Sequence, residues 1–339
     1  MNDPRPTDEN ELENLLSEPE AATVAALESV PGDIVVLGAG GKMGPTLAMM
    51  LRKAAPGRTI YAVSRFSDRQ VKSRIEAKGV ETVEADLLEE AAWKRLPDVP
   101  NVFYLVGMKF GVTGQQPLTW AMNAYVPALA ARRYHESRIV ALSTGNVYAF
   151  VAPDGGGSRE EDEPGPVGEY AQSCLGRERI FQHFSSCHGT SVTLIRLNYA
   201  NECRYGIIVD LTRKILHEEP VDVTMGAVNL IWQGDANNTI IRSLRLADSP
   251  PAILNVTGRE TVRVRDLAAR IGAVLGREPM LTGREADSAL LSNASRCVET
   301  FGPPATSLDE MVERIATWVA SGGKVLNKPT KYDVRDGRF

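Results

Sequence analysis

The sequence predicts an α/β protein with a doubly wound parallel sheet and a smaller α/β lobe toward its C-terminal end. Three observations predict this fold: short apolar runs alternate with helical patterns from Asp33 onward, glycines cluster directly after the first apolar run, and the alternation becomes irregular beyond residue 200. Repeated strand–helix units give parallel strands joined by right-handed crossovers. A chain of 339 residues is long enough to form one large domain with a companion lobe.

Six apolar runs are expected to form the strands of the sheet, and helical segments separate them. The predicted strands cover residues 33–38, 59–64, 80–86, 101–107, 138–144 and 191–198. The predicted helices between them cover residues 45–54, 71–79, 89–96 and about 117–134, and a further helix carries Tyr170. The looser region beyond residue 200 is expected to contain a strand at 252–258 and helices at 262–276 and 308–320.

The chain divides into four predicted segments. Residues 1–30 form a helical extension, 31–200 form the sheet domain, 201–320 form the smaller lobe interleaved with it, and 321–339 form a polar tail on the surface. Within the extension, a helix is expected from about Glu9 to Glu28, with an interruption near Pro19. A polar, glycine-rich insertion at 153–169 is expected to be a flexible loop at the site.

The composition argues against several classes of protein. A formal charge of −5 without an extended basic stripe argues against nucleic acid as a partner. Because no apolar run could cross a bilayer and the first residues do not read as a secretory signal, we expect a cytoplasmic protein without a membrane partner. The four cysteines and four histidines lack metal-ligand spacing, so we expect no metal site.

A glycine-rich turn follows the first predicted strand, in the segment VVLGAGGKMG. Glycines let the backbone bend sharply and approach a pyrophosphate, and the N-terminus of the following helix supplies free N–H groups. Because the cluster follows a strand and opens a helix, we interpret the domain as a Rossmann-type dinucleotide-binding domain; the alternative is a glycine-rich turn without a ligand. The residues assigned to this turn are Gly38, Gly40, Gly41, Lys42, Met43 and Gly44.

The ends of the second and third strands bear on which dinucleotide binds. NAD sites usually place a carboxylate after the second strand, where this chain has Ser64 and Arg65. Serine with arginine accepts a 2′-phosphate that a carboxylate would repel, so NADP is favoured over NAD; the alternative is that Arg65 is a solvated charge and NAD binds. After the third strand, Asp86 and Leu87 fit a contact with the adenine edge, although Asp86 could equally cap a helix.

Taken together, these segments resemble the extended short-chain dehydrogenase/reductase family of the NAD(P)-dependent epimerase and dehydratase type. The resemblance covers most of residues 33–320. Each motif is weak alone, and their order and spacing make the match specific. The matching segments are, in order, GAGGKMG, EADLL, LVGMKFGV, Asn123, LSTGNVYAF, EYAQSCLGRE, IRLNYANE, VNLIWQGD and ILNVTGRE.

The resemblance implies an active site and further coenzyme contacts. By similarity, Thr144 hydrogen bonds the substrate oxygen, with Ser143 as the weaker alternative, and Tyr170 is the acid/base that moves the substrate's hydroxyl proton. The coenzyme contacts that it implies, besides the glycine turn and the ends of strands two and three, are Val106, Gly107, Lys109, Tyr170 and Asn198.

The chain departs from the family pattern four residues after this tyrosine. The family has a lysine there, which binds the nicotinamide ribose and lowers the tyrosine's pKa, whereas this chain has Cys174, which carries no positive charge. Lys109, at a position that resembles a lysine of UDP-galactose 4-epimerase-like enzymes, is the catalytic residue expected to replace it. The alternatives are that Lys109 is a solvated loop lysine, or that Arg177 or a residue of the tail supplies the charge. Asn123 resembles the asparagine that orients the family lysine, so its role is open.

The implied function is that of an NAD(P)-dependent oxidoreductase or epimerase acting by hydride transfer on a sugar, a sugar nucleotide or a related polyhydroxy carbonyl compound. The cysteine favours an alternative, a catalytically impaired protein that binds the dinucleotide as a sensor or scaffold. The retained threonine and tyrosine favour the enzyme. Family members often dimerise through helices that match 117–134 and 170–186, so we expect a homodimer.

Overall fold

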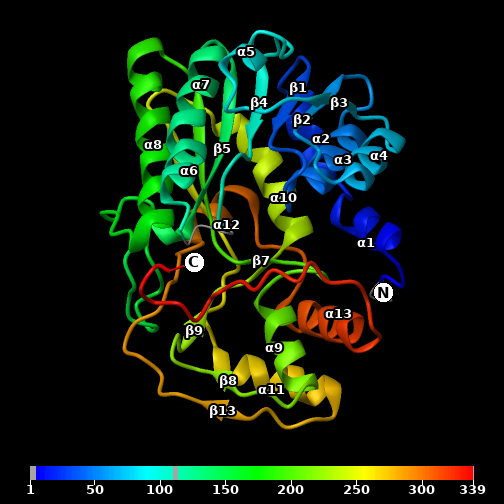
Figure 1. Ribbon diagram of the computed structural model, residues 1–339, viewed down its shortest axis with the longest axis vertical. Coiled ribbons are helices and arrows are strands. Elements are labelled where there is room, and N and C mark those ends of the chain that lie inside the picture. Colours follow the sequence, from blue (N-terminus) through cyan, green and yellow to red (C-terminus); the bar gives the residue numbers. More distant parts are fainter. Residues whose placement is uncertain (1–4, 110–113, 339) are drawn as a thin grey trace.

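A computed structural model describes residues 5–109 and 114–338. Its main sheet has seven parallel strands in the order β11-β6-β5-β4-β1-β2-β3, so the strand order reverses beside β1 (Figure 1). These strands are β1 (Ile34–Leu37), β2 (Ile60–Ser64), β3 (Glu81–Glu84), β4 (Asn101–Tyr104), β5 (Arg138–Thr144), β6 (Val192–Leu197) and β11 (Ala252–Val256). The predicted doubly wound α/β fold is confirmed.

The central strands are apolar on both faces, and this is why helices cover the sheet on both sides. Along β1, Ile34 and Val36 belong to one buried cluster, and Val35 and Leu37 belong to another. Successive side chains of a strand point to opposite faces, so an uninterrupted apolar run marks a strand that is buried on both. All four side chains are fully buried.

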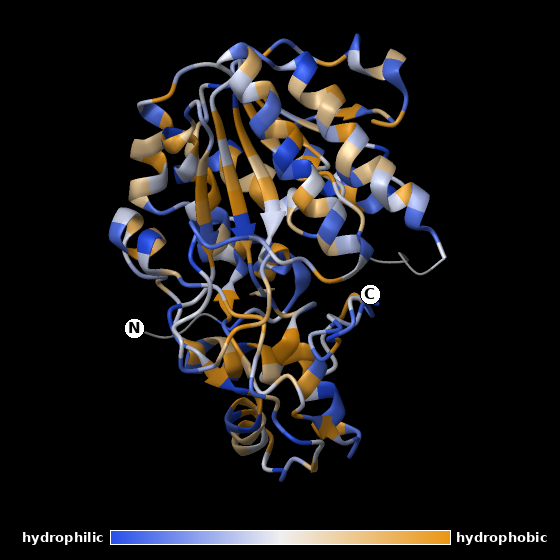
Figure 2. Cartoon of the chain, turned by 90° about the vertical axis from the view of Figure 1, so that its left-hand side faces the viewer, coloured by the Kyte–Doolittle hydropathy of each residue, from blue (hydrophilic) through white to orange (hydrophobic). Residues whose placement is uncertain are grey.

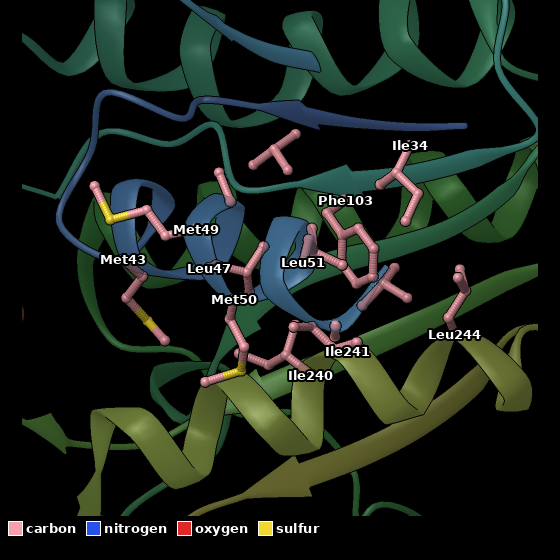
Figure 3. Close-up of a cluster of buried hydrophobic side chains, with 14 of the residues drawn as sticks. Ile34, Met43, Leu47, Met49, Met50, Leu51, Phe103, Ile240, Ile241 and Leu244 are labelled. Carbon is pink, nitrogen blue, oxygen red and sulfur yellow. The ribbon is translucent and has the colours of Figure 1, made fainter. Parts of the chain in front are cut away.

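On one face of the sheet, helix α3 (Gly44–Ala54) packs against α10 (Gln233–Arg242). Figure 3 shows Leu47 and Met50 of α3 beside Ile240 and Ile241 of α10. The helices on this face also include α4 (Arg69–Ala77). Residues 233–256, which form α10, the 3₁₀ turn η3 (Ser243–Leu246) and β11, thus return from the smaller lobe to the sheet.

The other face is covered by α8 (Gly168–His188) together with the helices that lie between β3 and β5 in the chain. Helix α8 carries Tyr170 and packs against α7 and the π-helical turn η1. No helical stretch within the described residues could serve as a transmembrane span. The elements on this face are α5 (Glu90–Trp93), α6 (Gln116–Trp120), η1 (Ala121–Tyr125), α7 (Val126–Arg133) and α8 (Gly168–His188).

The N-terminal extension forms two helices, α1 (Glu9–Leu16) and α2 (Ala21–Glu28), with the break where Pro19 was expected to cause it. Leu12 and Leu16 of α1 are fully buried in the core of the smaller lobe. Helix α2 packs on α10 beside the sheet. The extension therefore ties the two parts of the molecule together.

The smaller lobe is built on three helices around one apolar core, and Figure 2 shows apolar residues gathered there. The 3₁₀ turn η2 (Gly145–Val147) and helix α12 (Ser295–Phe301) lie closer to the sheet. The elements of the lobe are α9 (Ile207–Leu216), α11 (Val264–Leu275) and α13 (Leu308–Ala320), with strand pairs β7 (Ala200–Asn201) and β10 (Ile231–Trp232), β8 (Val221–Asp222) and β13 (Leu281–Thr282), and β9 (Ala227–Val228) and β12 (Val262–Arg263).

The polar insertion at 153–169 is held by β11, contrary to the expectation of a flexible loop at the site. Ser158 and Glu160 are buried. The backbone N–H of Asn255 donates to Glu160 Oε1 at 2.9 Å, and the side-chain amide of Asn255 donates to the carbonyl of Ser158 at 2.9 Å. Partners inside the protein thus satisfy the polar groups of the insertion at Ser158 and Glu160, while most of its other residues are exposed or half-buried.

The tail runs between the sheet domain and the smaller lobe (Figure 1), and most of its described residues are exposed or half-buried, with Thr330 and Tyr332 buried. The carboxylate of Asp210 accepts hydrogen bonds from the N–H and the hydroxyl of Thr330, at 2.8 and 2.6 Å. Tyr332 is buried, and its hydroxyl donates to the carbonyl of Asp222. These bonds anchor the tail on the smaller lobe.

A buried ion pair joins α8 to β6. Arg196 Nη2 lies 2.8 Å from Glu178 Oε2, and the side chains are 2% and 0% exposed. The Arg196 guanidinium also donates to the hydroxyl of Tyr148, which donates to Asn255 Oδ1, both at 2.8 Å. Each charge is paired, which burial requires because an unpaired ion in the interior is costly.

We predict that Glu178→Ala lowers the free energy of unfolding by about 3–5 kcal/mol, because it leaves the Arg196 charge buried without its partner. The measurement is urea unfolding followed by circular dichroism. Asp309→Ala is the control, since it removes an exposed pair with Arg270 and should leave the transition midpoint in place. Equal midpoints for the two variants would contradict the prediction.

Candidate active site

A cavity opens at the carboxyl ends of β1, β5 and β6, the edge at which open α/β sheets bind ligands. Its wall includes the turn after β1, the end of β5 at Thr144, Tyr170 on α8, and the segment after β6 that begins at Asn198. A second hollow lies at the ends of β2 and β3. Gly38, Gly41 and Leu105 line both, so the two hollows form one continuous cleft across the glycine turn.

The glycine turn has the geometry of a cradle that side chains would fill. Gly38 has a φ of +85°, and a Cβ there would lie 2.9 Å from the backbone of Leu105. A Cβ on Gly44 would lie 2.5 Å from the carbonyl of Ala39, whereas a Cβ on Gly41 would meet only the Gly38 carbonyl, at 3.3 Å. The turn is thus pressed against the sheet and open toward the cleft, as a bound pyrophosphate requires.

Helix α3 begins directly after this turn. Its N-cap residue, Met43, has no side-chain acceptor for the first N–H groups. Those groups and the positive end of the helix dipole favour an anion at this point. The residues present therefore fit a dinucleotide diphosphate.

Lys42 extends from the turn across the cavity. Its Nζ donates to the carbonyl of Ala200 at 2.6 Å and lies 4.2 Å from the centre of the Tyr205 ring. Burial lowers the pKa of Lys42 to about 7, while the nearby Glu202 carboxylate opposes that shift. The sequence placed Lys42 in the turn but did not reveal this crossing, because it depends on how the segment after β6 folds back.

The second hollow contains the residues predicted at the ends of β2 and β3. Arg65 Nη1 lies 3.8 Å from Asp86 Oδ2, and both side chains are substantially exposed. Asp86 also accepts a hydrogen bond from the N–H of Leu88 at 3.0 Å, which holds its carboxylate in place. The hollow is lined by Ser64, Arg65, Asp86, Leu87, Val106 and Gly107, as well as by Lys328 of the tail.

Thr144 and Tyr170 meet in the first cavity. The Tyr170 hydroxyl contacts the hydroxyl of Thr144 and the thiol of Cys174. Thr144 Oγ1 also lies 3.0 Å from Asn146 Oδ1 and accepts from the N–H of Asn146 at 3.2 Å. Burial, and then the Cys174 thiol, raise the pKa of Tyr170 well above its usual value, while Arg177 and Thr144 oppose this shift.

Ser143, the alternative to Thr144, is occupied elsewhere. Its hydroxyl donates to Glu178 Oε1 at 2.5 Å, on the buried ion pair behind the site. Successive residues of β5 point to opposite faces of the strand, so only one of the two hydroxyls can approach Tyr170. The geometry therefore favours Thr144.

Two cations lie near Tyr170. Lys109 Nζ is 6.0 Å from the centre of the Tyr170 ring, and burial lowers the pKa of Lys109 to about 8. Arg177 lies on the inward face of α8 and is 5% exposed. Residues 110–112 of the motif that contains Lys109 lie outside the described residues.

Asn123 and Asn198 are both buried, but only one is saturated with hydrogen bonds. Asn123 bonds the backbone of Met108 through both ends of its amide, at 2.8 and 3.1 Å. Asn198 lines the cavity, and its Nδ2 has no hydrogen-bond partner within the described part of the chain. Tyr199, next to it, has a φ of +43°, a strained backbone for a non-glycine residue.

Sequence reasoning missed Tyr205, Lys328 and Thr330. Tyr205 and Thr330 line the cavity, and Lys328 lines the second hollow. No motif marks these residues, because their position depends on the tail lying between the two lobes. Among the described residues, no cluster of potential metal ligands occurs.

Comparisons with known proteins agree with this geometry. The model of the NAD dependent epimerase/dehydratase family matches residues 34–225, more than half of the chain. Comparison with curated protein sequences gave no match.

Solved structures with a similar fold include several that bind sugar nucleotides. MoeE5 in complex with UDP-glucose and NAD is 21% identical, with a TM-score of 0.71, over 86% of this chain and 99% of that chain. UDP-glucose 4-epimerase from Thermotoga maritima, with UDP-glucose, is 17% identical, with a TM-score of 0.72 and the same coverage. UDP-glucuronic acid 4-epimerase from Bacillus cereus, in complex with UDP-glucuronic acid and NAD, is 16% identical, with a TM-score of 0.72, over 85% and 99% of the two chains.

We predict that Gly38→Ala lowers the affinity for a dinucleotide about tenfold or more. An alanine there would have a left-handed backbone, and its Cβ would lie 2.9 Å from the backbone of Leu105, directly after β4. Strain of this kind costs about 1–3 kcal/mol. The measurement is a titration with NADH and NADPH followed by nicotinamide fluorescence. Gly57→Ala is the control, because a Cβ there has no neighbour within 4 Å. Unchanged affinity in Gly38→Ala would show that the turn does not hold the ligand.

Proposed function

The chain belongs to the NAD-dependent epimerase/dehydratase family and is an enzyme of the NAD(P)-dependent class, and from this premise we propose that it moves hydride to and from a sugar nucleotide or a related polyhydroxy carbonyl compound. The observation that carries the proposal is the contact between Thr144 and Tyr170 in a cavity continuous with the glycine turn. A protein that only bound a dinucleotide would need neither hydroxyl at this position.

Each residue of the site has a distinct part in the proposed reaction. When bound, the nicotinamide supplies the hydride chemistry. Tyr170 takes the proton of the substrate hydroxyl as the carbon is oxidised and returns it when the carbonyl is reduced, and Thr144 holds that oxygen. Lys109, 6.0 Å from the Tyr170 ring at the cavity wall, would hold the nicotinamide ribose. The buried amide of Asn198 still has a donor to offer a ligand.

Two observations support a sugar nucleotide as the substrate. Hydroxyl and amide side chains line the cavity beyond Tyr170, including Asn198, Tyr205 and Thr330, and these groups suit a polyhydroxylated ligand. MoeE5 and the two epimerases with a similar fold bind UDP-sugars. The two epimerases are named for epimerisation, a reaction in which the same coenzyme takes and returns the hydride.

A homodimer through α6, η1 and α8 is also proposed. Large apolar side chains are exposed on this surface, namely Leu118, Trp120, Tyr125 and Val167. The indole N–H of Trp120 donates to Glu169 Oε2 at 2.5 Å, which holds the ring against α8. Clustered exposed aromatic and aliphatic side chains are typical of a surface that a second protein covers.

We predict that Tyr170→Phe lowers kcat about 10²- to 10⁴-fold and changes coenzyme affinity little, because the phenol moves the proton, whereas the glycine turn and the hollow at the ends of β2 and β3 hold most of the dinucleotide. The measurement is turnover on UDP-glucose, UDP-galactose and UDP-glucuronic acid with either coenzyme. Tyr134→Phe is the control, since that hydroxyl donates to the Pro97 carbonyl away from the site. Tight coenzyme binding without turnover, together with no effect of Tyr170→Phe, would identify a binding protein instead.

We further propose that NADP(H) is preferred to NAD(H), because Ser64 and Arg65 stand at the end of β2 in the hollow, whereas its carboxylates, Asp68 and Asp86, stand at the start of α4 and after β3. We predict that NADPH binds about tenfold more tightly than NADH, as one charge-assisted contact to a 2′-phosphate would give. Arg65→Met should remove the preference, and Ser64→Asp should reverse it. Arg69→Met is the matched control, because Arg69 pairs with Glu84 outside the hollow. Tighter binding of NADH by the unmodified protein would overturn the proposal.

A further inference from the structure

Arg177 is a buried cation on the same face of α8 as Tyr170 and Cys174. The three residues follow one another at spacings of four and three, which places them in line along a helix. Arg177 is 5% exposed and Cys174 is fully buried. The guanidinium is therefore screened from water on the inner side of the site, where a charge acts over a longer distance than at the surface.

The Arg177 guanidinium reaches the ends of β4 and β5. Nη1 donates to the carbonyl of Leu142 at 2.6 Å, and Nη2 donates to Asn123 Oδ1 at 2.8 Å. Its Nε has no hydrogen-bond partner within the described residues. A Cβ on Gly107 would lie 2.6 Å from Nη2, so the absence of a side chain just after β4 provides the space that the guanidinium occupies.

Asn123 connects this cation to the segment that carries Lys109. It lies in the π-helical turn η1, and its amide bonds three neighbouring residues. Oδ1 accepts from both Arg177 and the N–H of Met108, each at 2.8 Å, and Nδ2 donates to Met108 O and to Ser173 Oγ. Arg177 thereby helps to fix the backbone next to Lys109.

The electrostatics of Tyr170 show why a cation matters here. Burial and the adjacent Cys174 thiol raise the pKa of Tyr170, and Arg177 is the charge that opposes them. The charge of Lys109 acts instead on the thiol of Cys174 and lowers the pKa of that thiol. The ionisable groups around Arg177 are Cys174, Tyr104, Tyr170 and Glu178. Since Glu178 is paired with Arg196, the positive charge of Arg177 remains effective toward Tyr170.

We propose that Arg177 is the positioning residue that supplies the positive charge for proton transfer at Tyr170, so that the two tasks which one lysine would combine are divided between Arg177, which stabilises the phenolate, and Lys109, which holds the coenzyme. The inference rests on the proposed proton transfer at Tyr170. The small side chain of Cys174 fits this arrangement, because a lysine in its place would bring a second buried cation close to the guanidinium.

The direct test is the titration of Tyr170 itself. A multiply fluorinated tyrosine is incorporated at position 170, and its ionisation is followed by fluorine NMR, without and with coenzyme, so that no substrate is needed. We expect Arg177→Met to move the titration midpoint about one pH unit or more toward alkaline pH, since a nearby opposite charge changes a pKa by about 1–3 units. Arg177→Lys keeps the charge but loses the forked hydrogen bonds, so its titration midpoint should lie close to that of the unmodified protein.

Two comparison variants separate charge from structure. Arg179→Met removes an exposed cation of the same helix, whose partner is Gln182, and should leave the midpoint in place. Lys109→Met should weaken coenzyme binding and leave the midpoint within a few tenths of a unit of the unmodified protein. If Arg177→Met leaves the midpoint unchanged, or Lys109→Met moves it as far as Arg177→Met does, the division of tasks is wrong.

Activity gives the second readout. In the neutral range, turnover should fall about tenfold for each unit by which the Tyr170 pKa rises, and the pH profile of kcat should move toward alkaline pH with it. Cys174→Lys combined with Arg177→Met moves the charge back by one turn and should recover part of the loss. If the enzyme is active but its pH profile does not change in Arg177→Met, this inference is overturned and the proposed function stands. If the unmodified protein shows no turnover while the Tyr170 midpoint still depends on Arg177, the proposed function is overturned and this inference stands.

Discussion

The site depends on helix α8 burying polar side chains against the carboxyl ends of β4 and β5. Tyr170, Cys174, Arg177 and Glu178 all face inward, and removing such groups from water is costly unless each is partnered. Glu178 is matched by Arg196 and by the hydroxyl of Ser143, and Arg177 by Asn123 and the Leu142 carbonyl. These partners hold α8 at one rotation, and that rotation brings the phenol of Tyr170 to Thr144.

The two halves of the cleft differ in how far their charged groups are removed from water. Around Tyr170, desolvation disfavours the phenolate of Tyr170 and the ammonium groups of Lys42 and Lys109, so the charges that remain there act strongly on one another. At the other end, Arg65 and Asp86 are exposed, and their contact contributes little to stability. Exposed charges can change partners when a ligand arrives, whereas the positions of the buried Tyr170 and Arg177 are set before it binds.

The replacement of a lysine by Cys174 is therefore not equivalent to the loss of positive charge from the site. Arg177 brings charge from the protein interior, and Lys109 brings it from the segment after β4. Neither residue occupies the position of the missing lysine. The Arg177 guanidinium is accommodated by two features: Gly107 leaves space for it, and Asn123 in the π-helical turn accepts its hydrogen bond. The tail adds a third element, since Lys328 and Thr330 line the cleft from a segment that belongs to neither the sheet nor its helices.

The sequence by itself determined the features that depend on local patterns. Apolar runs of strand length, the glycines at the turn and the spacing of Tyr170 and Cys174 predict the sheet, the cradle and the place of the phenol, because strand pleat, backbone freedom and helical period act over a few residues. Only the tertiary structure decided which of Ser143 and Thr144 meets Tyr170, where Arg177 places its charge, and that the tail and Lys42 reach the cavity. Those outcomes depend on which groups, distant in sequence, share a buried volume, and no local period encodes that.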